Sequence, residues 1–330
     1  MSPQRIVIPG GSGLVGELLA RHFQERGHHV TVLTRSPYSA PWQTVHWDGL
    51  DRGPWVETLE GADVCINLAG RTVNCRYTLR NRQAIYQSRV HTARLIGDVI
   101  AGLEHPPRLW MNASTATIYR HALDRPMDEF TGEYGGYETI EGAFGRSRPA
   151  PETWNFSLQV ARDWENAIYE TPTPETRKIP LRISIFFSAQ PGTAFAIMSR
   201  LVRVGLGGTQ GSGRQFVSWI HEADFARAVE FLIEHEEIEG PVNLASPSPL
   251  PNSDFMAAFR EAWQMPNGIW APAPVIELGS FFMRTESELV LKSRRVVPGK
   301  LLDAGFQFEF PDWPDAAADL VRRWRERGAR

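Results

Sequence analysis

Lysine is nearly absent from this sequence. Only three of its 35 basic residues are lysines, at Lys178, Lys292 and Lys300, and the others are arginines. A catalytic motif that places a lysine at a fixed spacing from another residue can therefore occur at only three positions in this chain.

Cysteine, long apolar runs and net charge are scarce as well. The two cysteines, Cys65 and Cys75, have neither the number nor the spacing of a disulfide framework or a zinc site. No apolar run reaches the length of a membrane span, and the chain opens directly into a strand pattern, which leaves no room for a signal peptide. A net charge of −3 gives no electrostatic reason to expect nucleic acid or a membrane as partner. We expect a cytoplasmic monomer or homodimer, without a metal, that binds a small-molecule substrate.

Short apolar segments alternate with helical patterns over the first 190 residues. The predicted strands are rich in Val, Ile and Leu without polar alternation, which is typical of strands covered on both faces. They lie at residues 5–9, 29–33, 44–46, 62–68, 108–113 and 178–187, with helices at 14–26, 81–103 and 157–169. This order predicts an α/β fold with a Rossmann-type doubly wound parallel sheet over residues 1–190.

The pattern changes after Phe187. Residues 205–213 form a glycine-rich loop, and helices are predicted at 222–235 and at 254–263, the latter with Ser253 as N-cap. We expect a smaller mixed lobe over residues 191–330, some of whose segments return to the sheet. Residues 132–154 are predicted to be a long loop that either closes over a substrate or packs on the surface. Its aromatic residues are Tyr134, Tyr137, Phe144 and Trp154.

A glycine-rich turn joins the first strand to the first helix. Glycine at these positions lets the backbone turn tightly and approach a pyrophosphate, and the helix N-terminus supplies N–H groups and a positive dipole end. Because the pattern follows an apolar strand and opens a helix, it predicts a dinucleotide site. The turn reads Gly10, Gly11, Ser12, Gly13, Leu14, Val15, Gly16.

The end of the second strand indicates which dinucleotide binds. An acidic residue there would hold the ribose 2′-hydroxyl of NAD, but this chain has Thr34, Arg35 and Ser36. A guanidinium and hydroxyls suit a 2′-phosphate, so NADP(H) is preferred over NAD(H); the alternative is a solvated loop arginine.

Two further turns are candidates for cofactor contact. Asp48 follows the third strand and either accepts a hydrogen bond from the adenine amino group or serves its own turn. Leu68, Ala69 and Gly70 end the fourth strand, where small residues permit close backbone approach to the cofactor.

Several motifs together resemble the extended short-chain dehydrogenases/reductases, and within them an atypical branch whose members are called epimerase family proteins. That branch carries a small uncharacterised C-terminal domain. Besides the glycine turn and Asn67-Leu68-Ala69-Gly70, the resemblance rests on Ser88-Arg89, Trp164-Glu165, Gly205-Leu206-Gly207-Gly208, Gly211-Ser212-Gly213-Arg214-Gln215-Phe216, Ser218-Trp219-Ile220-His221 and Ala304-Gly305-Phe306. It implies NADP bound by the glycine turn, by Thr34 and Arg35, by Leu68 and Ala69, and by Arg89.

The catalytic dyad of short-chain dehydrogenases is missing. These enzymes place a tyrosine four residues before a lysine whose ammonium lowers the phenol pKa, with a Ser or Thr polarising the carbonyl. The residues four before the three lysines are Pro174, Glu288 and Val296. The helix where the dyad belongs reads Phe156-Ser157-Leu158-Gln159-Val160-Ala161. The usual mechanism is therefore excluded.

Other residues become the catalytic candidates. Ser114 and Thr115, after the fifth strand, would polarise a carbonyl or else cap the strand end, and Tyr119 is either the nearby phenol or a packing residue. The resemblance also draws attention to Arg120, which replaces a glycine usual after that tyrosine. His221 is a second acid/base candidate, with burial as a structural group as its alternative.

Substrate contacts are predicted near the second glycine-rich loop. Arg214 and Gln215 follow it and would grip an anionic or hydroxylated substrate, with Trp219 beside them. The leading hypothesis is an NADP(H)-dependent oxidoreductase or epimerase acting on a small carbonyl or hydroxyl compound, with a sugar-nucleotide-like compound as one candidate. The alternatives are a non-catalytic NADP(H)-binding sensor and a structural Rossmann scaffold with an empty site.

Overall fold

A seven-stranded parallel sheet forms the centre of the computed structural model, which describes residues 2–136, 138–141, 147–282 and 286–328. The strand order is β12-β8-β5-β4-β1-β2-β3, so the chain reverses direction across the sheet between β1 and β4. In such sheets the carboxyl ends of the strands beside that reversal open the ligand crevice. The strands span Arg5–Pro9 (β1), His29–Thr34 (β2), Gln43–His46 (β3), Val64–Asn67 (β4), Leu109–Thr115 (β5), Arg177–Ile183 (β8) and Val242–Leu244 (β12).

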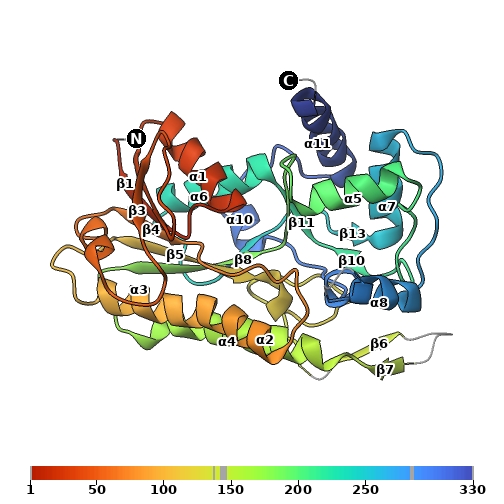
Figure 1. Ribbon diagram of the computed structural model, residues 1–330, viewed down its shortest axis with the longest axis horizontal. Helices are drawn as coiled ribbons and strands as arrows, with labels where there is room; N and C mark the ends of the chain where they lie inside the picture. The colour runs from red at the N-terminus through yellow and green to blue at the C-terminus, as the bar shows by residue number, and fades with distance from the viewer. Residues whose placement is uncertain (1, 137, 142–146, 283–285, 329–330) are drawn as a thin grey trace.

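Helices cover both faces of this sheet (Figure 1). On one face lie α1 (Leu14–Glu25) and α6 (Glu222–Glu234), and on the other α2 (Leu79–Tyr86), α3 (Thr92–Ile100) and α4 (Glu152–Glu170). All four residues of β4 are buried. The apolar, non-alternating strand composition is thus explained, and the predicted doubly wound α/β fold is confirmed.

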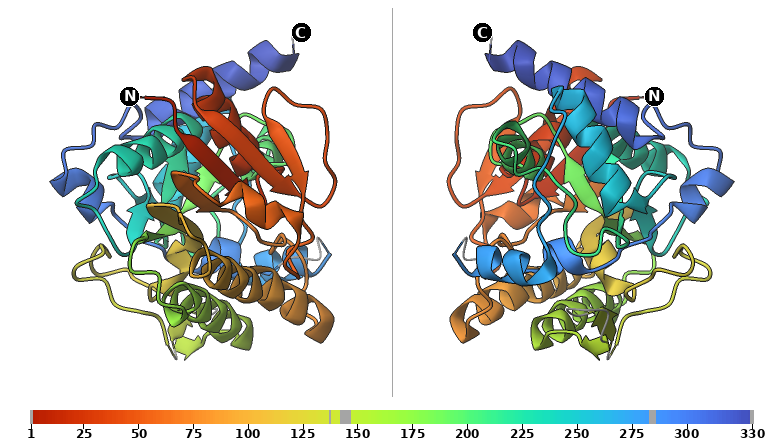
Figure 2. Two further views of the ribbon diagram at one scale, coloured as in Figure 1. Left: turned by 90° about the vertical axis from the view of Figure 1, so that its left-hand side faces the viewer. Right: turned by 90° about the vertical axis from the view of Figure 1, so that its right-hand side faces the viewer.

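A smaller lobe packs beside the sheet and is seen from its own side in the right-hand view of Figure 2. Its core is aromatic: the rings of Phe255 and Trp313 stack with centroids 4.1 Å apart, and Phe187 and Trp219 pack against Trp313. Its elements are β9 (Ile185–Phe187) paired with β11 (Trp219–His221), β10 (Phe216–Val217) paired with β13 (Leu250–Pro251), α5 (Ala194–Arg203), α7 (Asn252–Trp263), α8 (Ala273–Phe282), α9 (Glu288–Leu291) and α11 (Trp313–Gly328). The short helix α10 (Gly299–Asp303) instead packs against β12 of the main sheet, where Leu301 joins the core.

Two expected elements differ from the structure. The strand predicted at 178–187 is two strands in different sheets, because the backbone leaves the main sheet at Ser184, whose N–H and hydroxyl both donate to the Leu244 carbonyl. Ser253 is not an N-cap: α7 begins at Asn252, two residues before the predicted start, and Pro251 is in the cap position.

The helix predicted at 81–103 is also interrupted. A π-turn, Gln87–His91, separates α2 from α3 and contains Arg89. The predicted loop at 132–154 holds a short antiparallel hairpin of β6 (Thr139–Glu141) and β7 (Ser147–Pro149), and its last residues begin α4. Tyr137 and Phe144 lie outside the described residues. No helix in the described ranges is both long and apolar enough to cross a bilayer.

Candidate functional site

The glycine turn lies against the end of β4, with no room for side chains. Gly10 has a φ of 73°, and a Cβ on it would lie 2.7 Å from the backbone N and Cα of Ala69. A Cβ on Gly16 would lie 2.4 Å from the Cα of Gly11, so helix α1 can approach the turn this closely only with glycine there. Gly13 is the N-cap of α1 and offers no side chain of its own. The turn therefore presents bare backbone at a helix N-terminus, the arrangement that binds pyrophosphate.

The end of β2 is joined to this turn. The Thr34 hydroxyl donates to the Ser12 hydroxyl over 2.9 Å, and the Ser36 N–H lies 3.4 Å from the Thr34 oxygen. Arg35 and Ser36 are exposed beside them. The three residues predicted to meet the ribose thus lie next to the glycine turn, and none of them is acidic.

Asp48 lies in a turn of its own. Its Oδ1 accepts hydrogen bonds from the N–H groups of Leu50 and Asp51, which lower the pKa of this carboxyl. The side chain is exposed, and these contacts give it a role in the turn without any ligand. The adenine contact stays a prediction.

Arg89 reaches the end of β4 from the π-turn. Its guanidinium carbon lies 5.1 Å from the centre of the Trp164 ring, and its Nη2 donates to the Arg71 carbonyl over 2.9 Å. A Cβ on Gly70 would lie 3.4 Å from that carbon. Burial lowers the pKa of Arg89 to about 10. The Arg89 side chain is therefore held against Gly70, at the crevice edge of the sheet.

The residues after β5 point to different places. Thr115 is half-buried, and its hydroxyl donates to that of Thr117 over 3.1 Å. The neighbouring Ser114 is buried, and its hydroxyl donates to Glu165 Oε1 over 2.6 Å. Thr115 is therefore the more accessible of the two candidate hydroxyls.

Tyr119 belongs to a buried network behind this turn. Its hydroxyl lies 3.0 Å from Asn243 Oδ1 and accepts from Arg182 Nη1 over 2.8 Å. Arg182 also donates to both carboxylate oxygens of Glu165 and to the Tyr134 hydroxyl. Burial raises the pKa of Tyr119 to about 12. These contacts join Tyr119 to β8 and β12 and use the hydrogen-bonding capacity that a proton donor would need.

The candidates of the second glycine-rich region are mostly core residues. Trp219 has no exposed surface and packs against Trp313, and Gln215 is buried with its amide donating to the Gln210 carbonyl over 2.7 Å. Arg214 is exposed. His221 is fully buried, its Nδ1 accepts from the Ala223 N–H at the start of α6, and its Nε2 lies 3.2 Å from Asp319 Oδ2.

The burial of His221 predicts a loss of stability in acid. Burial lowers the pKa of His221 to about 4, below its unfolded value of 6.5, so the unfolded chain takes up a proton first as pH falls. Stability should therefore decline between about pH 6.5 and pH 4, at up to about 1.4 kcal/mol per pH unit from this group. The free energy of unfolding, measured with urea at several pH values over this range, should fall less steeply with pH for His221→Gln than for the unmodified protein. This holds whatever stability the variant loses at neutral pH. An unchanged slope would show that the histidine is not held neutral.

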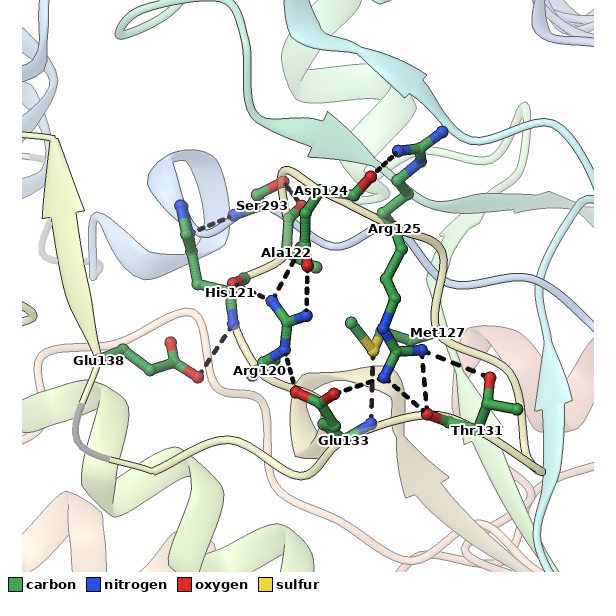
Figure 3. A network of polar contacts seen from close by, with 11 residues as sticks. Arg120, His121, Ala122, Asp124, Arg125, Met127, Thr131, Glu133, Glu138 and Ser293 are labelled. Atoms are coloured by element: carbon green, nitrogen blue, oxygen red, sulfur yellow. Dashed lines mark hydrogen bonds and ion pairs between the residues drawn. The ribbon is translucent and has the colours of Figure 1, made fainter.

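Ion pairs within the segment after Tyr119, and hydrogen bonds from Ser293 of the C-terminal region, hold this segment in place (Figure 3). Arg120 binds Asp124 and Glu133, which explains why an arginine is accommodated at this position. The His121 Nδ1 accepts from the Ser293 N–H over 3.0 Å, and burial lowers the pKa of His121 to about 4. The Ser293 hydroxyl donates to the Ala122 carbonyl.

Charged side chains of the C-terminal region also contact the segment after β5 and the start of α4. The Lys292 ammonium donates to the Thr117 carbonyl over 3.1 Å and is buried, and burial lowers its pKa to about 8. Glu288 accepts a 2.7 Å hydrogen bond from the hydroxyl of Ser157, in the helix where the dyad belongs. Sequence reasoning did not select Glu288 or Lys292 for the site. The one available signal was the scarcity of lysine, which makes Lys292 one of three lysines in the chain.

Fold and turn together define a Rossmann-type nucleotide-binding protein. Within the described ranges, no cluster of three or more His, Cys, Asp or Glu side chains is placed to hold a metal ion. Residues 6–143 match the model of the NAD dependent epimerase/dehydratase family, and residues 271–320 match a domain of unknown function, DUF1731.

Relatives that match over nearly the whole chain show which family of nucleotide-binding proteins it belongs to. An epimerase family protein of Staphylococcus epidermidis is 30% identical over 321 residues, covering 97% of this chain and 99% of the relative. The chain belongs to the epimerase family proteins, within the NAD(P)-dependent epimerase/dehydratase superfamily. The crystal structure of human epimerase family protein SDR39U1 (isoform 2) with NADPH is 26% identical, with a TM-score of 0.82 over 96% of this chain and 99% of that one. A nucleoside-diphosphate sugar epimerase of Corynebacterium glutamicum is 25% identical, with a TM-score of 0.74 over 99% of this chain and 62% of that one.

Proposed function

We propose that this protein binds NADP(H) in preference to NAD(H) and uses it to oxidise, reduce or epimerise a small carbonyl or hydroxyl compound. The observation that carries the cofactor preference is the end of β2, where Thr34, Arg35 and Ser36 lie beside the glycine turn without a carboxylate. A guanidinium matches the geometry of a phosphate and a carboxylate would repel it. The NADPH in the crystal structure of the human relative supports the same choice.

The bound cofactor would supply or accept the hydride, and the surrounding side chains would hold it. The glycine turn fits the pyrophosphate, because Gly10 and Gly16 let the turn pack against the end of β4 and the start of α1, which leaves bare backbone N–H groups at the helix N-terminus. Arg89 would lie at the same edge, beside Gly70. Thr115 is the hydroxyl best placed to polarise a substrate carbonyl, because Ser114 is committed to Glu165.

The cofactor preference is tested by replacing Arg35 with alanine. Loss of a charge-assisted hydrogen bond of about 1.5–3 kcal/mol should weaken NADPH binding roughly 10- to 100-fold. NADH, which lacks the 2′-phosphate, should bind as before. Both affinities are measured by the quenching of protein fluorescence.

The matched control is Arg21→Ala, an exposed arginine on α1, which should change neither affinity. An equal loss of NADPH and NADH binding in Arg35→Ala would indicate a folding defect instead. Equal thermal stabilisation of the unmodified protein by both cofactors would overturn the preference for NADP(H).

The second candidate function is a non-catalytic NADP(H)-binding sensor, which the missing Tyr-Lys dyad favours. Consumption of NADPH in the presence of a panel of small aldehydes and ketones, lost in Thr115→Ala while NADPH still binds, would exclude it. Cofactor binding without turnover of any of these compounds would support it.

A further inference from the structure

Residues 286–293 of the C-terminal region border the crevice. Ligands of such sheets bind beyond the carboxyl ends of the strands, so a substrate would meet the segments after β4 and β5 and the start of α4, which packs against the turn after β5. Residues 286–293, which we call the wall segment, hydrogen-bond to all three. The Tyr77 N–H donates to Glu286 Oε1 over 2.9 Å, the Ser157 hydroxyl donates to Glu288 Oε2 over 2.7 Å, and the Lys292 ammonium donates to the Thr117 carbonyl over 3.1 Å.

The wall segment is held from both sides. On the side of β5, the Ser293 N–H donates to His121 Nδ1 over 3.0 Å, and the Ala122 N–H donates to the Ser293 carbonyl over 3.2 Å (Figure 3). On the side of the smaller lobe, the Phe216 N–H donates to the Ser293 hydroxyl over 2.9 Å. The charged side chains of the wall segment are all buried, at Glu286, Glu288 and Lys292. These contacts make it a fixed boundary of the crevice and not a surface loop.

A small cavity lies between the wall segment and the second glycine-rich loop. Its volume is about 40 Å³, which is room for a group of a few atoms. Leu291 of the wall segment closes one side of it, because a Cβ on Gly211 would lie only 3.1 Å from Leu291 Cδ2. Other side chains that line it are the apolar Leu123 and Ile140 and the polar His121, Ser212 and Gln215. Gln215, a predicted substrate contact, is thus at this cavity.

No charged side chain belongs to the described lining of this cavity. His121 is neutral at physiological pH, because burial and the neighbouring Lys292 and Arg294 lower its pKa to about 4. The ammonium of Lys292 and the guanidinium of Arg294 already donate to backbone carbonyl groups. Arg214, predicted to grip an anionic substrate, is exposed and lies outside this lining. A phosphate placed here would lose its hydration without gaining a counter-charge, which is costly.

We propose that the wall segment admits small uncharged carbonyl or hydroxyl compounds to the crevice and excludes nucleoside-diphosphate sugars. Pockets for larger ligands enclose roughly 300–1,000 Å³, far more than the cavity beside the wall segment. The uncharged lining gives the second reason, because a diphosphate needs cations or many N–H donors around it. This inference rests on the proposed function, since it takes the carboxyl edge of the sheet as the place of the reaction and narrows the class of substrate there.

The test measures access to Thr115 with a thiol placed there. Thr115→Cys is made in a Cys75→Ser background, where the remaining native cysteine, Cys65, is fully buried. The NADPH complex, in which the cofactor covers its own side of the crevice, is treated with three reagents. Iodoacetamide is small and uncharged, iodoacetate is similar in size but negative, and iodoacetamidofluorescein is large and negative. Each rate is divided by the rate of the same reagent with Arg21→Cys in the same background, which places a thiol on an exposed position of α1.

We expect iodoacetamide to react at position 115, with iodoacetate about 100-fold slower in relative rate because its carboxylate finds no counter-charge there. The fluorescein reagent should be slower still. Leu291→Ala shortens a side chain of the wall segment and should raise the relative rate of the fluorescein reagent about 10-fold, because the space left is only partly refilled. Leu289→Ala is the matched control, since Leu289 lies on the same short helix but is exposed, and it should leave all three rates unchanged.

Equal relative rates for the three reagents would overturn the inference, and so would an unchanged fluorescein rate in Leu291→Ala. A lack of reaction with iodoacetamide would overturn it as well, since a small uncharged compound would then not reach Thr115. Calorimetric titration of the NADPH complex with UDP-glucose should show no binding at millimolar concentration, and binding would contradict the exclusion directly. Failure of NADPH to bind in the first place would instead overturn the proposed function, and the inference with it.

Discussion

Gly10→Ala should abolish dinucleotide binding and destabilise the protein by several kcal/mol. Two effects add at this position. Its φ of 73° costs an L residue about 1–2 kcal/mol, and the new Cβ would lie 2.7 Å from the backbone of Ala69, which is too close for contact. The backbone would have to move apart where the pyrophosphate is expected to bind. Urea unfolding and NADPH fluorescence titration measure the two losses.

Gly27 provides the matched control for this change. It has a φ of 83°, yet a Cβ on it would meet nothing within 4 Å. Gly27→Ala should therefore cost only the conformational term of about 1–2 kcal/mol and leave NADPH affinity unchanged. If the two variants lose equal stability and both bind NADPH, the close approach of the glycine turn to Ala69 is not needed for stability or for cofactor binding.

Arg182→Met should cost about 3–5 kcal/mol, because it leaves the buried Glu165 carboxylate without its main partner. The guanidinium is 2% exposed and donates to both oxygens of Glu165 and to the hydroxyls of Tyr119 and Tyr134. One side chain thus joins β8 to α4 and to the segment after β5. Equilibrium unfolding in urea measures the loss.

An exposed ion pair serves as the comparison. Arg94 and Glu170 are joined by two hydrogen bonds, but both side chains are 44% exposed, so Arg94→Met should cost less than about 1 kcal/mol. The double variant Glu165→Leu/Arg182→Met should recover part of the stability lost by Arg182→Met, since it removes the uncompensated charge. A double variant less stable than Arg182→Met would show that the unpaired carboxylate is not the source of the loss.

Local signals predicted the first strand, the glycine turn and the first helix well. The apolar strand, the glycine turn and the helix after it are contiguous in sequence, and the glycines are required by backbone contacts over short distances, as at Gly11 and Gly16. The predicted strand boundaries were less accurate, because the position at which a strand ends depends on the neighbouring strand. The hydrogen bonds from Ser184 to the Leu244 carbonyl are an example.

The reaction end of the site was predicted less completely. Ser157 and Glu288, whose side chains are joined by a hydrogen bond, are separated by 131 positions along the chain, and no periodicity relates them. The candidates His221 and Trp219 stand in a distinctive motif, yet both are fully buried, because the same residues that make the motif recognisable form the core of the smaller lobe.

The sequence by itself determined the Rossmann sheet, the glycine turn, the absence of an acidic residue after β2 and the absence of the Tyr-Lys dyad. These are statements about which residues are adjacent in the chain or are not there. Only the tertiary structure decided that Ser157 and the buried Glu288 carboxyl are joined by a hydrogen bond, and that Ser114 is committed to Glu165 while Thr115 is not. The physical reason is that hydrophobic patterning specifies which side chains are buried, whereas the partners of a buried polar group are set by the packing of distant segments.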